Sequence, residues 1–136
     1  MDRYQLLHFA SDDALAESAA QKWIDNLKSA VRGQPYLAAL SGGRIAKKFC
    51  SALARLAQND PAALSDVHFF WADERCVRPD NPESNFFAAN ECLFRPLKFP
   101  AAQIHRIPGE SPAEIAARDA EASLQQLATL GRHGQP

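Results

Sequence analysis

Two short apolar runs, each followed at once by polar residues, constrain the fold most. The first run spans 36–40 (YLAAL) and stops at a Ser-Gly-Gly turn, and the second spans 67–72 (VHFFWA) and stops at an acidic pair. Uniformly apolar runs of this length are typical of strands buried on both faces, as in parallel sheets covered by helices. The sequence therefore predicts an α/β fold.

The segments before and between these runs have the periodicity of amphipathic helices. A short apolar run at 4–9 predicts a further strand that leads into a helix over about 12–31, which Gly33 ends. The apolar face of this helix is expected to contain Leu15, Ala19, Trp23, Leu27 and Val31. A second helix is expected to bury Ile45, Phe49, Leu53 and Leu56.

The rest of the chain continues the alternation after a polar, proline-rich loop at 73–83. Ser84 or Asn85 is a candidate cap for a helix that passes through Phe87 and Leu93 and ends at Pro96. A fourth strand is expected at 103–107. The last helix is expected to begin at Ser111-Pro112, with Glu114 in its first turn, to bury Ala116, Ala120, Leu124 and Leu127, and to end at Gly131.

Strands that alternate with helices predict right-handed crossovers and a doubly wound, mostly parallel sheet with helices on both faces, that is, a Rossmann-like fold. A chain of 136 residues is long enough for one hydrophobic core without disulfides or a structural metal. We therefore expect a single α/β domain over 1–131 and a flexible tail at 132–136.

Composition argues against several classes of function. A formal net charge of -1 gives no electrostatic footprint for nucleic acid or an anionic membrane. Neither an N-terminal targeting segment nor an apolar stretch of roughly eighteen residues is present, so a cytoplasmic location is expected. Cys50, Cys76 and Cys92 form no C-x-x-C pair, which indicates reduced thiols rather than a zinc site.

Two loops carry the residues most suited to chemistry, and both leave the carboxyl ends of the apolar strands. Ligands of doubly wound sheets bind at that rim. Gly42 and Gly43 let the backbone approach an anion in front of a helix N-terminus, although a tight turn alone would also explain them. Arg75 is a candidate for binding a phosphate or carboxylate and Asp73 for orienting a hydroxyl, although an ion pair within the loop remains the alternative.

The blocks LAALSGGR and VHFFWADERCVRPDNPESNFFAANECL resemble the glucosamine-6-phosphate isomerase/6-phosphogluconolactonase family, and the resemblance extends over nearly the whole chain. It favours the 6-phosphogluconolactonase branch. For that branch it implies hydrolysis of 6-phosphoglucono-lactone to 6-phosphogluconate in the oxidative pentose phosphate pathway, on a doubly wound fold and without a metal or organic cofactor.

The resemblance also assigns roles to residues. Ser41, Gly42 and Gly43 would line the phosphosugar pocket through backbone N–H groups. Supporting catalytic roles fall to Arg75, which would supply positive charge, and to Asp73, which would position the sugar or a partner side chain, while Glu74 would brace the loop. Arg44 stands where the family usually continues with Ser-Thr-Pro, and its guanidinium is a candidate substitute for the lost phosphate contacts.

A second departure is the absence of the Gly-x-Asp-Gly-His segment that carries the family's expected general base, so the chain resembles an amino-terminal portion of the family domain. None of the four histidines is a convincing replacement. His8 and His68 lie in predicted strands, His105 is favoured as structural at the edge of the pocket, and His133 lies in the tail.

Two other functions remain open. One is a glucosamine-6-phosphate isomerase or deaminase, which shares the fold and the glycine loop. The other is a non-catalytic phosphosugar-binding module, which would pair an open sheet edge with another polypeptide or with a second copy of itself.

Overall fold

The two apolar runs form a parallel two-stranded sheet, and helices lie on either side of it. The computed structural model describes residues 3–131. In chain order its elements are α1 (Asp12–Lys28), β1 (Tyr36–Leu40), α2 (Arg44–Asn59), the 3-10 helix η1 (Pro61–Leu64), β2 (Val67–Trp71), α3 (Asn85–Ala89), the π-helix η2 (Asn90–Phe94), α4 (Arg95–Leu97), the 3-10 helix η3 (Ala101–Gln103) and α5 (Ala113–Gly131).

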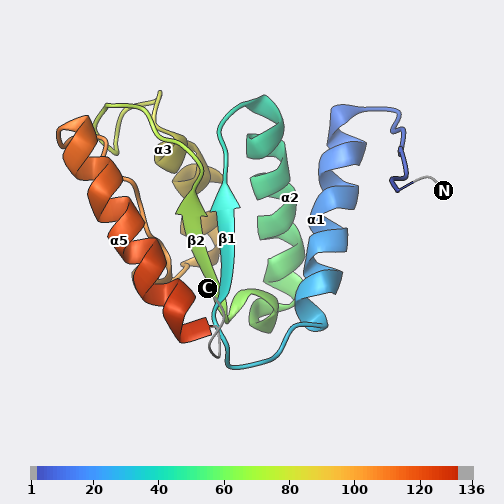
Figure 1. Cartoon of the computed structure of the whole chain (residues 1–136). Helices are drawn as coiled ribbons and strands as arrows, with labels where there is room; N and C mark the ends of the chain where they lie inside the picture. The colour runs from blue at the N-terminus through green and yellow to red at the C-terminus, as the bar shows by residue number, and fades with distance from the viewer. Residues whose placement is uncertain (1–2, 132–136) are drawn as a thin grey trace.

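β1 and β2 pair residue for residue, from Tyr36 opposite Val67 to Leu40 opposite Trp71. The ladder continues one residue further, where the backbone N–H of Ala72 donates to Leu40 O at 2.9 Å. The strands lie between α5 on one side and α2 with α1 on the other (Figure 1). This arrangement confirms the predicted α/β fold and places both strand-leaving loops at one edge.

Alternation along the strands separates a buried face from a less covered one. On the buried face Tyr36, Ala38, Leu40, Val67, Phe69 and Trp71 join a core shared with α1, α2, η1 and η2. On the other face Ala39 is exposed, so the prediction that 36–40 is buried on both faces is wrong at this position. Phe70, which pairs with Ala39 on the same face, is buried and stacks on His105, so that face is covered at β2.

The strand predicted at 4–9 is absent. These residues have no regular secondary structure, and the side chains of Tyr4 and Leu6 are 81% and 71% exposed. The segment lies beyond α1 and away from the strands (Figure 1). A strand needs a neighbour for its backbone hydrogen bonds, and no described strand pairs with this segment.

Helix α1 begins where predicted, because the Ser11 side chain accepts a hydrogen bond from Ala14 N at 3.1 Å. It ends at Lys28 rather than at about 31. The buried face is Ala16, Ala20 and Ile24, so the predicted face is wrong by one position at Leu15 and Ala19. Small alanine side chains allow α1 to pack closely along α2, which the apolar periodicity alone does not indicate.

The predicted helix through Phe87 and Leu93 is present, but it is built from α3, η2 and α4 and extends one residue beyond Pro96. Arg95 N donates to Asn90 O across the π-helical turn. A proline lacks the N–H that a regular helix would use at this point, and the wider turn accommodates it.

The predicted fourth strand at 103–107 is reduced to a single bridge between Phe69 and Ile104. Gln103 belongs to the preceding 3-10 helix η3, and Pro108 follows without a backbone donor, so little of the segment is free to pair. The last helix begins at Ala113, close to the predicted start. Ala116 is buried, whereas Leu124 is exposed.

The predicted tail at 132–136 lies outside the described residues. Across residues 3–131, no helix is both long enough and apolar enough to cross a membrane.

The ring of Phe69 should carry a large part of the stability, because it is fully buried and contacts Trp23, Phe94 and Phe99. We expect Phe69→Ala to lower the free energy of unfolding by about 3–5 kcal/mol in urea titrations. The matched control Leu6→Ala should change it by less than about 0.5 kcal/mol, because Leu6 is exposed. A large effect of Leu6→Ala would show that the 4–9 segment packs after all.

Candidate active site at the carboxyl ends of the strands

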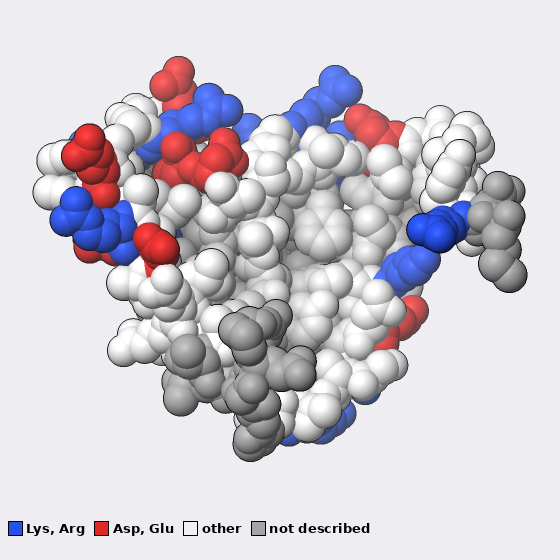
Figure 2. Space-filling model, in the orientation of Figure 1, with Lys and Arg blue, Asp and Glu red and all other residues white. Residues whose placement is uncertain are grey.

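The loops that leave β1 and β2 begin side by side, because the Ala72–Leu40 hydrogen bond joins the strands at their carboxyl ends. Ser41, Gly42 and Gly43 connect β1 to α2, and Asp73, Glu74 and Arg75 follow β2. Figure 2 shows acidic and basic side chains gathered along this upper rim, whereas the middle of the visible face carries almost none. The structure thus brings the two predicted loops to one edge of the sheet.

Positions 42 and 43 in the first loop require glycine for different structural reasons. Gly43 has φ 103°, a left-handed conformation that residues with a side chain rarely adopt. Gly42 lies directly against Asn85, and a Cβ atom on Gly42 would overlap the Asn85 side-chain oxygen. Open space surrounds the position where a Cβ of Gly43 would lie, so the backbone there is accessible.

Helix α2 begins at this loop with its positive end uncapped. Gly43 is its N-cap, no side chain caps it, and its first turn contains no acidic residue. The first N–H groups of a helix lack intrahelical acceptors, and the helix dipole makes that end favourable for an anion. Helix α1 differs, because the Ser11 side chain and two aspartates occupy its first turn.

Arg44 points toward the start of α1. Its side chain is 87% exposed, and its Nε atom lies 3.8 Å from an Asp12 carboxylate oxygen. Lys48 contacts Asp12 at 2.9 Å and Asp13 at 2.8 Å, and its hydrogen bond is the main cause of the lowered pKa of Asp12. The described contacts of Arg44 therefore link it to this acidic pair rather than to the 73–75 loop.

Glu74 braces the second loop, as the family resemblance implied. Its Oε1 atom accepts from the N–H groups of Arg75 and Asn85, both at 2.7 Å, and its Oε2 atom accepts from Ser84 Oγ at 2.9 Å and Phe86 N at 3.0 Å. Burial alone would raise the pKa of Glu74, but these four donors outweigh it and lower the pKa. The carboxylate thus ties the loop to the start of α3.

Asp73 and Arg75 flank this brace. Asp73 is exposed, and both its backbone O and its Oδ1 atom lie within hydrogen-bonding distance of the Asn85 amide. Among residues 3–131 no carboxylate pairs with the Arg75 guanidinium, whereas Arg78 in the same loop pairs with Asp80 at 3.2 Å. Arg75 is therefore free to bind an anion from solution.

Sequence reasoning did not single out Asn85 or Gly109 for the site, yet Asn85 contacts both loops and Gly109 packs against the second one. A Cβ atom on Gly109 would overlap the backbone O of Arg75, so the 107–111 segment lies directly against the 75–77 backbone. Asn85 was expected only as a possible helix cap, and that role falls to Ser84, whose Oγ accepts from Phe87 N at 3.1 Å. Neither a glycine in a loop nor an asparagine at the start of a helix gives a sequence signal for a contact this far along the chain.

His68 and His105 pair with each other, and this pairing supports the structural role expected for both. Their Nδ1 and Nε2 atoms lie 2.9 Å apart, and the ring of His105 also stacks on Phe70. Burial lowers the pKa of both imidazoles, and each is expected to be neutral at pH 7. His68 is the second residue of β2, three residues before its carboxyl end, so the pair lies roughly 10 Å below the rim.

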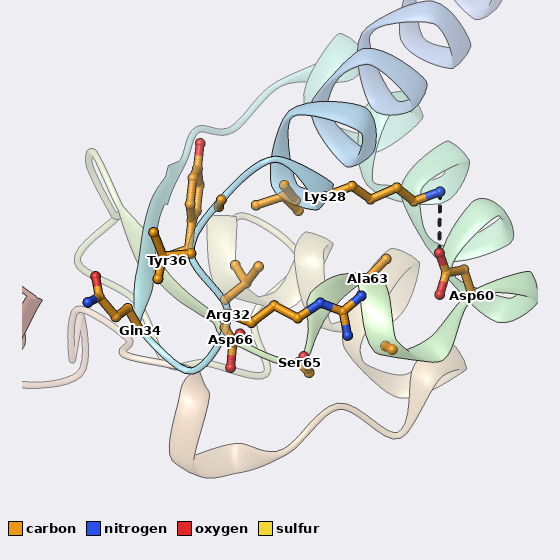
Figure 3. Close-up of a pocket in the computed structure, with 13 residues that line it drawn as sticks. Lys28, Arg32, Gln34, Tyr36, Asp60, Ala63, Ser65 and Asp66 are labelled. Atoms are coloured by element: carbon orange, nitrogen blue, oxygen red, sulfur yellow. Dashed lines mark ion pairs between the residues drawn. The ribbon is translucent and has the colours of Figure 1, made fainter.

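A cavity of about 210 Å³ lies at the opposite, amino ends of the strands (Figure 3). Tyr36 lines it together with charged groups that are already paired, Lys28 with Asp60 at 3.4 Å and Asp66 with Gly33 N at 2.9 Å. The Arg32 side chain extends across it (Figure 3). Ligands of α/β sheets bind at the carboxyl ends, so this cavity is not the candidate active site.

Within the described range, no group of three or more His, Cys, Asp or Glu side chains is arranged to hold a metal ion. All three cysteines are free thiols, as predicted, and burial raises the pKa of Cys50 to about 12. The rim therefore offers backbone donors, a guanidinium and carboxylates as its chemical groups.

In the comparison with protein families, the glucosamine-6-phosphate isomerases/6-phosphogluconolactonase model matches residues 10–135. Among curated proteins, a 6-phosphogluconolactonase of Aggregatibacter actinomycetemcomitans is 34% identical over 92 residues, which cover 68% of this chain and 40% of that protein. A probable chloroplastic 6-phosphogluconolactonase of Oryza sativa subsp. indica is 37% identical over 132 residues, which cover 93% of this chain and 38% of that protein.

Solved structures share the fold. A 6-phosphogluconolactonase from Thermotoga maritima superposes with a TM-score of 0.71 at 28% identity, over 90% of this chain and 53% of that one. A monomeric glucosamine-6-phosphate deaminase superposes with a TM-score of 0.77 at 20% identity, over 92% of this chain and 52% of that one, and this likeness concerns the fold alone. The chain thus spans about half the length of the solved structures and about 40% of the curated relatives.

The Glu74 brace should make stability depend on acid pH. Because its pKa is lower in the folded state than the ordinary 4.5, the brace contributes fully above that value and is lost as the pH falls through the folded pKa. We expect Glu74→Gln to lower the free energy of unfolding by about 1–3 kcal/mol at neutral pH and to flatten its decline in acid. Urea titrations over this pH range measure both effects, with the exposed loop carboxylate variant Glu83→Gln as control.

The His68–His105 pair should make the free energy of unfolding depend on pH in a higher range than Glu74 does. The pKa of each imidazole is lowered from 6.5, so the unfolded chain binds more protons and the free energy of unfolding should fall as the pH drops below 6.5. The double variant His68→Gln/His105→Gln should lose this slope. Ring-proton NMR titration gives the two pKa values directly, and values at or above 6.5 would contradict the expectation.

Proposed function

Because the chain belongs to the glucosamine-6-phosphate isomerase/6-phosphogluconolactonase family, we propose that it carries the phosphosugar-binding half of a 6-phosphogluconolactonase site. The whole protein would hydrolyse 6-phosphoglucono-lactone to 6-phosphogluconate in the oxidative pentose phosphate pathway. The curated relatives described above are named for this enzyme.

One observation carries the proposal: an uncapped helix N-terminus and an unpaired arginine share the rim. The accessible Gly43 backbone opens α2, and Arg75 has no carboxylate partner among the described residues. A phosphate at the helix end would receive backbone N–H groups, and Arg75 would add a charge-assisted bond to an anionic group of the ligand. In this proposal Ser41, Gly42 and Gly43 bind the phosphosugar, and Asp73 orients its hydroxyl groups.

Arg44 has a weaker claim to the phosphate. The distance of 3.8 Å to Asp12 already gives its guanidinium an acidic neighbour. Rotation of its exposed side chain would still bring it to the start of α2 at little cost. We therefore propose it as a secondary contact.

A general base for water is the group that the residues described by the structure do not supply at the rim. The described histidines at the sheet pair with each other about 10 Å from the rim, and an imidazole is the usual base at neutral pH. We therefore expect the chain to bind 6-phosphogluconate without accelerating opening of the lactone. The reaction needs no metal or organic cofactor in this proposal.

A glucosamine-6-phosphate isomerase or deaminase is the second candidate, because the family model includes that activity. The Asp73-Glu74-Arg75 block favours the lactonase. Offering 6-phosphogluconate and glucosamine 6-phosphate to the same protein separates the two, since the preferred ligand should bind at least about tenfold more tightly.

Two further expectations concern the surroundings of the chain. Among the described strands β1 pairs only with β2, so its other edge is open to a further strand, either from another polypeptide or from a second copy. Self-association through this edge and a cytoplasmic location both stay predictions. The net charge of -1 continues to argue against nucleic acid as a partner.

The test of this function is binding of 6-phosphogluconate by calorimetry, with wild type compared with Arg75→Ala. Loss of charge-assisted hydrogen bonds is worth about 1.5–3 kcal/mol, so affinity should fall roughly 10- to 100-fold. Arg95→Ala is the matched control, because Arg95 is an exposed arginine paired with Glu91 on α4 and should bind as wild type does. Equal affinities for wild type and Arg75→Ala would refute the role of Arg75.

The companion assay follows hydrolysis of freshly prepared 6-phosphoglucono-lactone against a buffer blank, because the lactone also opens unaided. Acceleration by this chain that disappears in Arg75→Ala would show that a complete site is present. The expectation that the chain lacks a general base would then be wrong.

A further inference from the structure

Asn85 is a buried polar residue at the rim whose amide has no role in the fold of its own helix. It is only 7% exposed and is the first residue of α3, whose cap is the hydroxyl of Ser84. Burying an amide costs free energy unless it is hydrogen-bonded. The position of its side chain therefore calls for an explanation outside α3.

The amide nitrogen of Asn85 is directed at Asp73. It lies 3.1 Å from the Asp73 backbone O and 3.4 Å from Asp73 Oδ1, so a single NH₂ group contacts both the backbone and the carboxylate of that residue. Asp73 is otherwise an exposed residue in a loop. The contact restrains a carboxylate that would otherwise sample several rotamers.

The amide oxygen of Asn85 is directed at the other loop. It packs against Gly42 so closely that a Cβ atom at that position would overlap it. Gly42 is not in the left-handed region, so the backbone itself would accept alanine there. Asn85, rather than backbone conformation, is therefore the reason for a glycine at position 42.

The backbone of Asn85 is itself held in place. Its N–H donates to Glu74 Oε1 at 2.7 Å, and the same carboxylate binds Ser84 and Phe86 on either side. The side chain thus projects from a fixed point between the two loops. A rigid support of this kind is what a pre-organised binding site requires.

From this geometry we propose that Asn85 is a positioning residue for the phosphosugar site: it locks the Asp73 carboxylate at a fixed distance from the glycine loop. This inference rests on the proposed function. Asp73 then meets the sugar hydroxyl groups in one orientation while the phosphate occupies the start of α2. The ligand does not need to order the carboxylate when it binds, which saves side-chain entropy.

The first arm of the test needs no ligand. Gly42→Ala should destabilise the protein because its new methyl group meets the Asn85 oxygen, and Asn85→Ala should destabilise it through the lost hydrogen bonds. In Gly42→Ala/Asn85→Ala the clash is gone, so the double variant should be clearly more stable than the sum of the single effects predicts. Additive effects in urea titrations would overturn the proposal.

The second arm measures binding of 6-phosphogluconate at a temperature where every variant is folded. Asn85→Ala should bind about tenfold more weakly, the equivalent of one hydrogen bond. Asn85→Asp keeps the size of the side chain but places a second carboxylate beside Asp73, and it should weaken binding at least as much. It also introduces an acid into the first turn of α3, where the helix dipole favours negative charge, so it serves as the second variant if Asn85→Ala does not fold.

The matched control is Gln103→Ala. Gln103 also donates its amide to two backbone oxygens, Ser65 O at 2.9 Å and Val67 O at 2.8 Å, but at the amino ends of the strands. Gln103→Ala should lower the free energy of unfolding and leave the affinity for 6-phosphogluconate unchanged. Equal affinities of Asn85→Ala and Gln103→Ala, with wild type binding normally, would make Asn85 merely structural and overturn the inference alone. Absence of binding by wild type would instead overturn the proposed function, and this inference with it.

Discussion

The pairing of β1 with β2 is the constraint on which the rest of the structure depends. Five residues of each strand are matched in register, and the Ala72–Leu40 hydrogen bond extends the ladder to the point where both chains leave the sheet. A shift of one residue would turn Phe69 and Trp71 away from the core. The same shift would move the 41–43 loop away from the 73–75 loop. The hydrophobic pattern that stabilises the core therefore also aligns the rim.

The elements that sequence could predict are those whose signal is local. The apolar runs and the Ser11 and Ser84 caps all depend on neighbours a few residues away. The segment 4–9 has the same apolar character as β1, but a strand requires a partner, and partners are not encoded within six residues. The burial of Ala16 and Ala20 likewise depends on how closely α2 approaches, which periodicity does not contain.

In the candidate site, too, the residues with a local sequence signal could be predicted and the long-range contacts could not. Asp73, Glu74, Arg75 and the glycine loop could be located from sequence because they follow apolar strands directly. The contact of Gly42 with Asn85 joins positions 43 residues apart, and that of Gly109 with Arg75 joins positions 34 apart. Neither pair has a local pattern. What the sequence could not predict is the set of contacts that holds the 41–43 loop, the 73–77 loop and the 107–111 segment together.

The charges of the rim are arranged so that one cation stays available. Glu74 would be the natural partner of its neighbour Arg75, but four donors from the backbone and from Ser84 already saturate its oxygens. Arg44 and Lys48 are drawn to the aspartates that begin α1. Arg75 is thus left without a carboxylate within the described residues, on the same rim as an uncapped helix end. A loop whose acid is satisfied by backbone N–H groups can present its arginine to an anionic ligand, because the ligand does not have to displace an internal ion pair first.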